Sequence, residues 1–293
     1  MAGRGIFSSA RFYLVATCSD ALRAVADTSS SAFQGTLMSD FATYPSLRHK
    51  PVIVSGGASG IGEGIVREFA AQGSKVGFVD IAADAGRTLE AELTGKGQMV
   101  KFIACDVTDI PAYQAAIGSF EQAHGAALAL VNNAANDTRH KWEEVTPESW
   151  DKSIAVNARH AFFAAQAVLP GMVAAKQGSI INFGSISWMI LAGNLAAYTA
   201  SKAAMHGLSR SLARDVGKYG IRVNTLVPGW IMTERQLTHW VDETASKLID
   251  EQQALTGRLY PADIARMALF LAADDSQMIS GQDFLVDGGW AHG

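Results

Sequence analysis

The chain has 293 residues, of which 48% are hydrophobic and 18% are charged, and its formal net charge is −4. This length and composition are typical of an ordinary globular protein with a large core. The slightly acidic balance argues against nucleic acid as a partner, and no apolar run in the sequence is long enough to span a membrane. The two cysteines, Cys18 and Cys105, lack metal-ligand spacing and predict a reduced protein of the cytoplasm.

Residues 1–45 differ from the rest of the chain. The first 37 residues contain three arginines, six serines and an apolar patch at residues 12–16, which is shorter than a secretory core needs. A targeting segment is one interpretation. Met38 offers another, because it is an alternative start of the chain. We therefore predict that residues 1–45 are an extension outside the fold, either disordered or an artefact of the choice of start.

From residue 51 onward, short runs rich in β-branched residues alternate with longer helical patterns. This alternation is typical of parallel strands joined by crossover helices. It predicts one α/β domain over residues 46–293, a Rossmann-type, doubly wound, parallel seven-stranded sheet with helices on both faces. Long helices are expected over residues 149–175 and 195–218. The predicted strands are Val52–Ser55, Lys75–Asp80, Val100–Cys105, Ala127–Val131, Ser179–Phe183, Arg222–Val227 and Asp283–Val286.

The first predicted strand runs into a glycine-rich turn with the spacing G-x-x-x-G-x-G. Glycine lets the backbone approach a pyrophosphate closely, and the helix expected from Glu63 onward would point its N-terminus at that group. Strand, turn and helix together predict a dinucleotide site. The residues of the turn assigned to it are Gly56, Ser59, Gly60, Ile61 and Gly62.

The second predicted strand ends in Asp80. A carboxylate at this point accepts hydrogen bonds from the adenosine ribose and repels a 2′-phosphate. The flanking positions hold Ser59 and Ile81, neither of which is basic. The sequence therefore predicts NAD rather than NADP, and a simple cap at the strand end is the alternative role for Asp80.

Polar residues also follow the third and fourth predicted strands, at the edge of the sheet where ligands of such folds bind. Asp106, with Val107, is placed to bind the adenine amino group. Asn133 and Ala134 are placed to border the adenosine ribose. Asn132 is as readily a structural residue that ties neighbouring strands together.

Tyr198 and Lys202 lie on one face of a predicted helix because they are four residues apart. At about 4 Å and an effective dielectric near 20, the ammonium would favour the phenolate by about 4 kcal/mol, or roughly three pKa units. The phenol would then be a usable base near neutral pH. A solvated helix face is the alternative interpretation of this spacing, but Ser185 and the glycine turn favour a redox site.

The chain resembles the short-chain dehydrogenase/reductase family over about residues 50–290. Two positions depart from the family pattern: Ser55 stands where threonine is usual, and Ala135 replaces the last glycine of Asn-Asn-Ala-Gly. The resemblance implies a redox enzyme and, through the segment at residues 281–290, a homotetramer. It rests on the glycine turn, Asp106, Asn132, Asn133, Ala134, Asn157, Ser185, Tyr198, Lys202, Pro228 and Gly229.

The resemblance also implies roles for the matching residues. Tyr198 would take the proton of the substrate hydroxyl, while Lys202 would lower the tyrosine pKa and hold the nicotinamide ribose. Ser185 would hydrogen-bond the substrate oxygen, and Asn157 would position a water that relays the proton to solvent. The nicotinamide carboxamide would be held by Pro228, Gly229, Ile231 and Thr233.

The segments expected to face the substrate combine hydrogen-bonding groups with aromatic rings, which suits a sugar better than a steroid. They resemble the NAD-dependent D-xylose and related aldose 1-dehydrogenases of this family, which oxidise the anomeric hydroxyl to a lactone. A substrate loop is expected over about residues 230–255. Packing is an equally good interpretation of the tryptophans. A loop at a subunit interface is an equally good interpretation of Arg139 and His140. The predicted substrate residues are Asn136, Arg139, His140, Ser187, Trp188 and Trp230.

Two other functions remain open from the sequence. One is a 3-oxoacyl thioester reductase or another secondary alcohol dehydrogenase on the same scaffold, against which Asp80 argues if that reductase uses NADPH. The other is a dinucleotide sensor without catalysis, which would not need Tyr198 and Lys202. No cluster of ligand side chains in the sequence predicts a metal.

Overall fold

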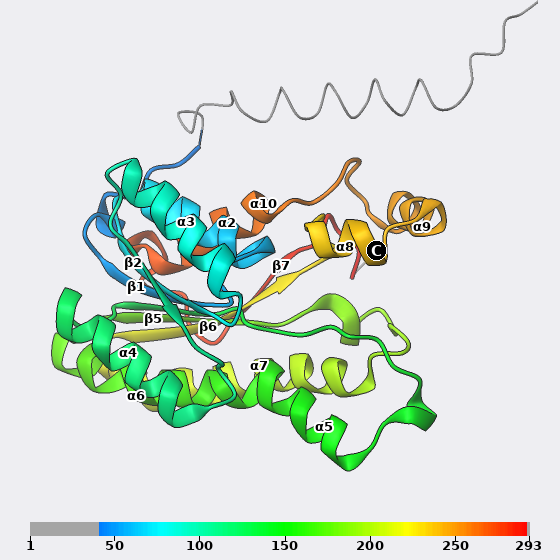
Figure 1. The fold of residues 1–293 in the computed structure, drawn as a ribbon, viewed down its shortest axis with the longest axis horizontal. Helices are drawn as coiled ribbons and strands as arrows, with labels where there is room; N and C mark the ends of the chain where they lie inside the picture. The colour runs from blue at the N-terminus through cyan, green and yellow to red at the C-terminus, as the bar shows by residue number, and fades with distance from the viewer. Residues whose placement is uncertain (1–40, 292–293) are drawn as a thin grey trace, which may run out of the picture. The chain divides into compact units, whose positions relative to one another are not determined.

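The computed structural model describes residues 41–291, so residues 1–40 of the predicted extension lie outside the described residues. The strands are β1 (Pro51–Ser55), β2 (Lys75–Asp80), β3 (Val100–Ala104), β4 (Ala129–Asn132), β5 (Gly178–Phe183), β6 (Ile221–Pro228) and β7 (Asp283–Val286). All pairings are parallel, and the order across the sheet is β3-β2-β1-β4-β5-β6-β7 (Figure 1). The predicted fold class is confirmed, and each strand lies within two residues of its predicted position.

Helices cover both faces of the sheet (Figure 1). They are α2 (Gly60–Ala71), α3 (Ala83–Gly95), α4 (Ile110–His124), α5 (Pro147–Ile154), α6 (His160–Ala175), α7 (Ala196–Val216), α8 (Glu234–His239), α9 (Glu243–Gln252) and α10 (Pro261–Ala272). Apolar side chains of α2, α3 and α10 pack on one face together with Val52 and Val54. Those of α4, α6 and α7 pack on the other face with Ile53. Successive residues of β1 therefore point to opposite cores, as in a strand buried on both sides.

Two predicted helices differ from the structure. The helix expected from Glu63 begins at Gly60, so the glycine turn itself supplies the first helical turn. The stretch predicted as one helix over residues 149–175 consists of α5 and α6, joined by a π-helical turn at Ala155–Arg159. Such turns are frequent at functional sites. No periodic sequence pattern marks this one, because a single π turn hardly changes the helical spacing.

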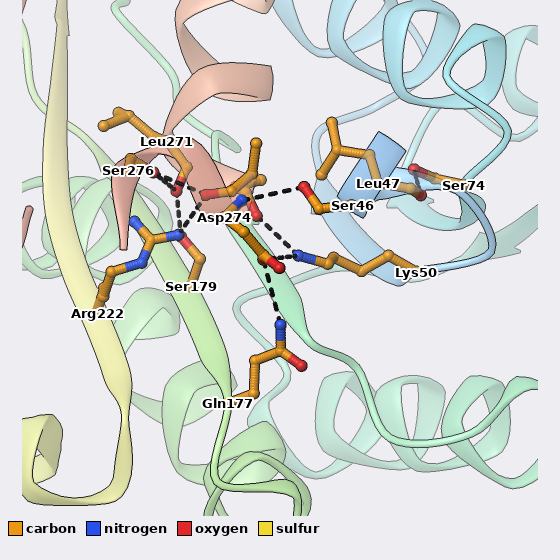
Figure 2. Close-up of polar contacts among 12 residues, drawn as sticks. Ser46, Leu47, Lys50, Ser74, Gln177, Ser179, Arg222, Leu271, Asp274 and Ser276 are labelled. Atoms are coloured by element: carbon orange, nitrogen blue, oxygen red, sulfur yellow. Dashed lines mark hydrogen bonds and ion pairs between the residues drawn. The ribbon is translucent and has the colours of Figure 1, made fainter. Parts of the chain in front are cut away.

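The end of α10 is fastened to the amino-terminal edge of the sheet (Figure 2). Lys50, which is 7% exposed, donates from Nζ to Ala272 O at 3.0 Å and lies 3.2 Å from Asp274 Oδ1. From β6, Arg222 donates to Ala273 O at 3.1 Å. These cations meet the carbonyl groups that the end of a helix leaves unpaired. They hold α10, and through it α2, in a fixed place over the sheet.

The strand order reverses between β1 and β4. The chain runs from β1 outward to β3, then returns to β4 on the other side of β1. In open α/β sheets a ligand binds beyond the carboxyl ends of the strands at this point. Within residues 41–291, no helix is long and apolar enough to cross a membrane, and no three side chains of His, Cys, Asp or Glu are grouped to hold a metal ion.

Candidate active site

The glycine turn has the geometry that a bound pyrophosphate requires. Gly56 and Gly60 have positive φ angles of 67° and 56°, which side-chain-bearing residues rarely adopt. A Cβ atom on Gly62 would lie 1.8 Å from Gly56 O, so only glycine fits there. Ser59 precedes α2 without capping it through its side chain. The first amides of α2 are thus available to an anion, and the turn fits a dinucleotide.

Asp80 lies beside the turn at the end of β2. Its Oδ2 accepts from the amide of Ala58 at 3.0 Å, and its Oδ1 accepts from the amide of Ala82 at 2.9 Å. The carboxylate therefore caps the strand end and is held against the glycine turn at the same time. An ionised carboxylate has about four lone-pair sites, so the sites that these two amides leave free can accept hydrogen bonds from ribose hydroxyls. Asp80 can therefore both cap the strand end and accept hydrogen bonds from the adenosine ribose of a dinucleotide.

The end of β4 braces the turn from the other side. The Ser55 hydroxyl accepts from the amides of Asn133 and Ala134, both at 3.1 Å. The side chain of Asn133 donates to Ser55 O and to Gly56 O, both at 3.0 Å. Asn132 bridges to Asn182 of β5 at 2.8 Å, as its structural interpretation predicts. The Asn133 side chain thus shapes the turn.

Asp106 and Val107 follow β3 at the same edge of the sheet. Asp106 Oδ1 accepts from the amide and the hydroxyl of Thr108, both at 2.8 Å, and Val107 is buried. Neither residue borders the large cavity described below. The side chain of Asp106 is exposed, so it can still meet an adenine ring that lies along this edge.

Ser185, Tyr198 and Lys202 line one cavity of about 700 Å³. Ser185 follows β5, while Tyr198 and Lys202 lie four residues apart on α7, which packs against β6. Lys202 is 2% exposed, and its Nζ donates to Phe183 O at 2.9 Å. A buried ammonium held by a strand-end carbonyl cannot swing away from the cavity. The spacing predicted from the sequence therefore places three candidate catalytic groups together.

The charge balance at Tyr198 differs from the sequence prediction. Burial raises the pKa of Tyr198 to about 12, a hydrogen bond with Ser185 lowers it, and the charge of Asp137 raises it. Burial lowers the pKa of Lys202 to about 8, and Asp137 raises it. The lowering of the tyrosine pKa that we predicted from Lys202 is not found. The Lys202 ammonium is held on Phe183 O and lies 5.7 Å from the centre of the phenol ring, so burial dominates.

Asn157 lies in the π turn, 1% exposed, and all its side-chain bonds go to protein. Its Oδ1 accepts from the amide of Asn136 at 2.8 Å, and its Nδ2 donates to Asn136 O at 3.1 Å and to Ser153 O at 3.0 Å. The side chain therefore fixes the loop after β4. The N–H donors of its side chain are used, so Asn157 can offer a water only acceptors, namely its backbone carbonyl and the second lone pair of Oδ1.

Not every predicted substrate residue faces the cavity. Trp188 is turned away, since its Nε1 donates to His206 Nε2 at 3.1 Å. Neither His140 nor Asn136 lines the cavity. The amide of His140 donates to Asn194 O, and Asn136 is held by Asn157. The predicted residues that do line it are Ile61, Asn133, Arg139, Ser185, Ser187, Tyr198, Lys202, Pro228, Gly229, Trp230, Ile231 and Thr233.

The segment after β6 closes the cavity on the far side. Thr233 accepts from the amide of Gln236 at 3.3 Å and so caps α8, and a Cβ on Gly60 would lie 3.2 Å from Thr233 Cγ2. This places the predicted nicotinamide segment beside the glycine turn. The guanidinium of Arg139 lies 4.2 Å from the ring centre of Trp240 and 5.8 Å from that of Trp230.

Sequence reasoning gave several residues of this region no individual role, although Asp137 lies between the predicted substrate residues Asn136 and Arg139, and the predicted substrate loop at residues 230–255 contains Arg235 and Gln236. Asp137, Arg235, Gln236 and Trp290 line the cavity. His206, which the sequence left without a role, holds Trp188. Their roles depend on contacts between segments far apart in the chain, such as Asp137 with Gln236, so no local motif marks them.

Known proteins define the class of this molecule. A family model described as Enoyl-(Acyl carrier protein) reductase matches residues 56–291. The chain belongs to the short-chain dehydrogenase/reductase family and is an oxidoreductase that acts on alcohol groups. It is 43% identical over 249 residues to D-xylose 1-dehydrogenase of Caulobacter vibrioides, covering 85% of this chain and 98% of the relative. It is 42% identical over 247 residues to a probable galactose dehydrogenase of Rhizobium meliloti, covering 84% and 96%.

Solved structures agree with this class. A 3-oxoacyl-[acyl-carrier protein] reductase from Brucella melitensis with bound NAD has a TM-score of 0.76 and 30% identity, covering 85% of this chain and 94% of its own. A blue fluorescent protein from a metagenomic library in complex with NADPH has a TM-score of 0.77 and 34% identity, covering 84% and 99%. The cofactor of the present chain is therefore a nicotinamide dinucleotide.

Proposed function

We propose that this protein is an NAD-dependent sugar dehydrogenase that oxidises the anomeric hydroxyl of an aldose such as D-xylose to the lactone. The observation that carries the proposal is the cavity that Ser185, Tyr198 and Lys202 line together with other hydrogen-bonding groups and Trp230. A sugar needs such donors and acceptors for its hydroxyls and a flat apolar surface for its ring. The similarity to D-xylose 1-dehydrogenase supports the same substrate class.

Each candidate catalytic residue either transfers a proton or positions a reacting group. Tyr198 removes the proton of the anomeric hydroxyl, and Ser185 hydrogen-bonds the same oxygen as charge develops on it. Lys202, held on Phe183 O, keeps a positive charge beside the phenol and would hold the nicotinamide ribose. Asn157 holds the loop after β4, and its backbone carbonyl would bind a relay water. When bound, the dinucleotide accepts the hydride from the substrate carbon.

The proposed dinucleotide site extends along the edge of the sheet. The glycine turn would hold the pyrophosphate, and Asp80 would favour NAD by accepting hydrogen bonds from the ribose hydroxyls. Asp106 and Val107 would border the adenine, and Asn133 with Ala134 would border the adenosine ribose. The cavity-lining segment Pro228, Gly229, Ile231 and Thr233 would hold the nicotinamide.

We also propose a homotetramer, from the C-terminal segment at residues 281–290, and light scattering would test it. The cytoplasmic location predicted from the sequence stays a prediction. The alternative activity, reduction of a 3-oxoacyl thioester, is favoured by the resemblance to the Brucella melitensis reductase. It is disfavoured by Asp80 if it depends on NADPH.

A single assay separates these activities. The protein is mixed with NAD and a panel of pentoses and hexoses, and in parallel with NADPH and acetoacetyl thioester, while the NAD(P)H absorbance is followed. We expect NADH formation with one or more aldoses. Activity in the thioester assay alone would refute the sugar proposal.

A further inference from the structure

The loop after β4 reaches across the cavity to α8 through the carboxylate of Asp137 and through the hydroxyl of Thr138, which accepts from Arg235 at 3.4 Å. Asp137 Oδ1 accepts from Arg235 Nε at 3.0 Å, and Asp137 Oδ2 accepts from Gln236 Nε2 at 2.6 Å. Both partners lie on α8, almost a hundred residues further along the chain. The Asp137 side chain is 25% exposed, compared with 50% for Arg235, so the carboxylate faces inward.

Asp137 is held in place from both sides. The preceding residue, Asn136, is bound through its amide and its carbonyl by the buried side chain of Asn157. Gln236 is bound in turn, since its Oε1 accepts from Trp230 Nε1 at 3.0 Å. A polar group fixed in this way is preorganised, so a ligand that uses it loses little side-chain entropy.

Asp137 is the only carboxylate among the described residues that line the catalytic cavity, where the cations are Arg139, Lys202 and Arg235. An ionised carboxylate offers about four lone-pair sites, and two of those of Asp137 are used. A poly-hydroxylated substrate needs strong acceptors for its hydroxyl hydrogens, and a charged acceptor forms stronger hydrogen bonds than a neutral one.

We propose that Asp137 is a specificity-determining residue that accepts hydrogen bonds from the substrate's hydroxyl groups and ties α8 over the bound sugar. This inference rests on the proposed sugar-oxidising function and adds to it the group that recognises hydroxyls away from the reacting carbon. Asp137 would thus both recognise the substrate and hold α8 over the cavity.

The same carboxylate acts on the proton-transfer groups. Burial is the largest cause of the raised pKa of Tyr198, and the negative charge of Asp137 raises it further. Arg235 partly neutralises that charge, because it lies 3.0 Å away. Removal of Asp137 should thus make the phenolate easier to form, while removal of Arg235 should make it harder. If Asp137 only held the loop to α8, removal of Asp137 and removal of Arg235 would not change the pKa of Tyr198 in opposite directions.

The experiment compares Asp137→Asn, Arg235→Met and, as a matched control, Asp84→Asn, which removes a fully exposed carboxylate paired with Arg87 on α3. For each, KM for the aldose, KM for NAD and the pH dependence of kcat/KM for oxidation are measured. With D137N we expect KM for the aldose to rise about tenfold, which is the loss of one charged hydrogen bond. KM for NAD should stay unchanged.

The acidic limb of the pH profile should move to lower pH in D137N and to higher pH in R235M, and D84N should move neither. An unchanged aldose KM in D137N, or limbs that move the same way in both variants, would overturn the inference. If D137N does not fold, R235M still tests it, since Arg235 is half-exposed. A wild-type protein that oxidises another alcohol but no aldose would contradict the proposed substrate instead, and the two pH shifts would then be measured with that alcohol.

Discussion

The indole Nε1 of Trp188 donates to Nε2 of His206 at 3.1 Å, and Nδ1 of His206 lies 2.9 Å from Asp283 Oδ1. A histidine of α7 thus joins the loop that follows Ser185 to the last strand of the sheet. Asp283 is bound on its other oxygen by Arg210 at 2.6 Å. The loop carrying Ser185 is therefore anchored by a polar chain that runs behind the cavity.

Replacement of this histidine should loosen the loop. In His206→Phe, the Trp188 Nε1 group and the Asp283 carboxylate both lose a partner, so the protein should lose about 1–3 kcal/mol of stability. Urea unfolding measures the loss. His206→Gln, which can both donate and accept, should retain more of the stability. Equal stability of the Phe variant and the wild type would show that the chain of contacts contributes nothing.

Tyr198→Phe should abolish turnover and keep dinucleotide binding. A positioned general base contributes about a hundredfold to ten-thousandfold, and the phenol ring is retained for packing. Stopped-flow measurement of NADH formation and a fluorescence titration with NAD separate the two effects. If the variant has no turnover and still performs the function of the protein in the cell, the dinucleotide-sensor hypothesis is favoured.

Oxidation should become faster as the pH rises. Burial holds the pKa of Tyr198 at about 12 and outweighs the hydrogen bond with Ser185, which lowers it. The phenolate fraction therefore increases with pH throughout the neutral range. Initial rates of oxidation measured across that range should rise, while reduction by NADH should change little, because the phenol that it needs stays protonated throughout the neutral range. A pH-independent oxidation rate would indicate that another group is the base.

Asp80→Asn should weaken the preference for NAD. The amide keeps an acceptor for the Ala58 or Ala82 amide but lacks the charge that repels a 2′-phosphate. We expect the ratio of kcat/KM for NAD to that for NADP to fall by about tenfold. Asp84→Asn on the neighbouring helix α3 is the control, and it should leave the ratio unchanged. If Asp80→Asn also leaves it unchanged, Asp80 is only a strand-end cap.

His160 should make the fold sensitive to acid. Burial lowers its pKa to about 4, the charge of Lys202 lowers it too, and a hydrogen bond with Ala134 raises it. The pKa of His160 is lower in the folded state than in the unfolded state, so its protonation destabilises the fold. The stability that depends on neutral His160 is therefore fully present above about pH 6.5 and is lost as the pH falls toward 4. The loss is about 3 kcal/mol. In unfolding curves recorded over this range, His160→Gln should show a shallower decline.

Lys50→Met should destabilise the fold without affecting the site directly. The variant removes the donor to Ala272 O and leaves that carbonyl buried, which costs about 1–3 kcal/mol. Lys96→Met, which removes a half-exposed partner of Glu92, should cost less than about 0.5 kcal/mol. Thermal unfolding of both variants gives the comparison, and equal losses would show that the end of α10 does not depend on Lys50.

Most of the fold was predictable because buried parallel strands are runs of β-branched residues and helices have their own period. Tyr198 and Lys202 were predictable for the same reason, since their spacing is local. The direction of Trp188, the bond between Asp137 and Gln236, and the role of His206 were not. Each depends on how distant segments pack, and the charge balance at Tyr198 depends on burial that no spacing reveals.

The π turn at Ala155–Arg159 means that this helical stretch contains one residue more than a regular α-helix of the same rise. Deletion of a single residue there would restore regular winding and leave the flanking helices α5 and α6 in nearly their present orientation. Asn157 would then turn away from the loop after β4, although every helix of the fold could still form. Insertions and deletions elsewhere in loops change length alone, whereas at this position they decide which way an asparagine faces.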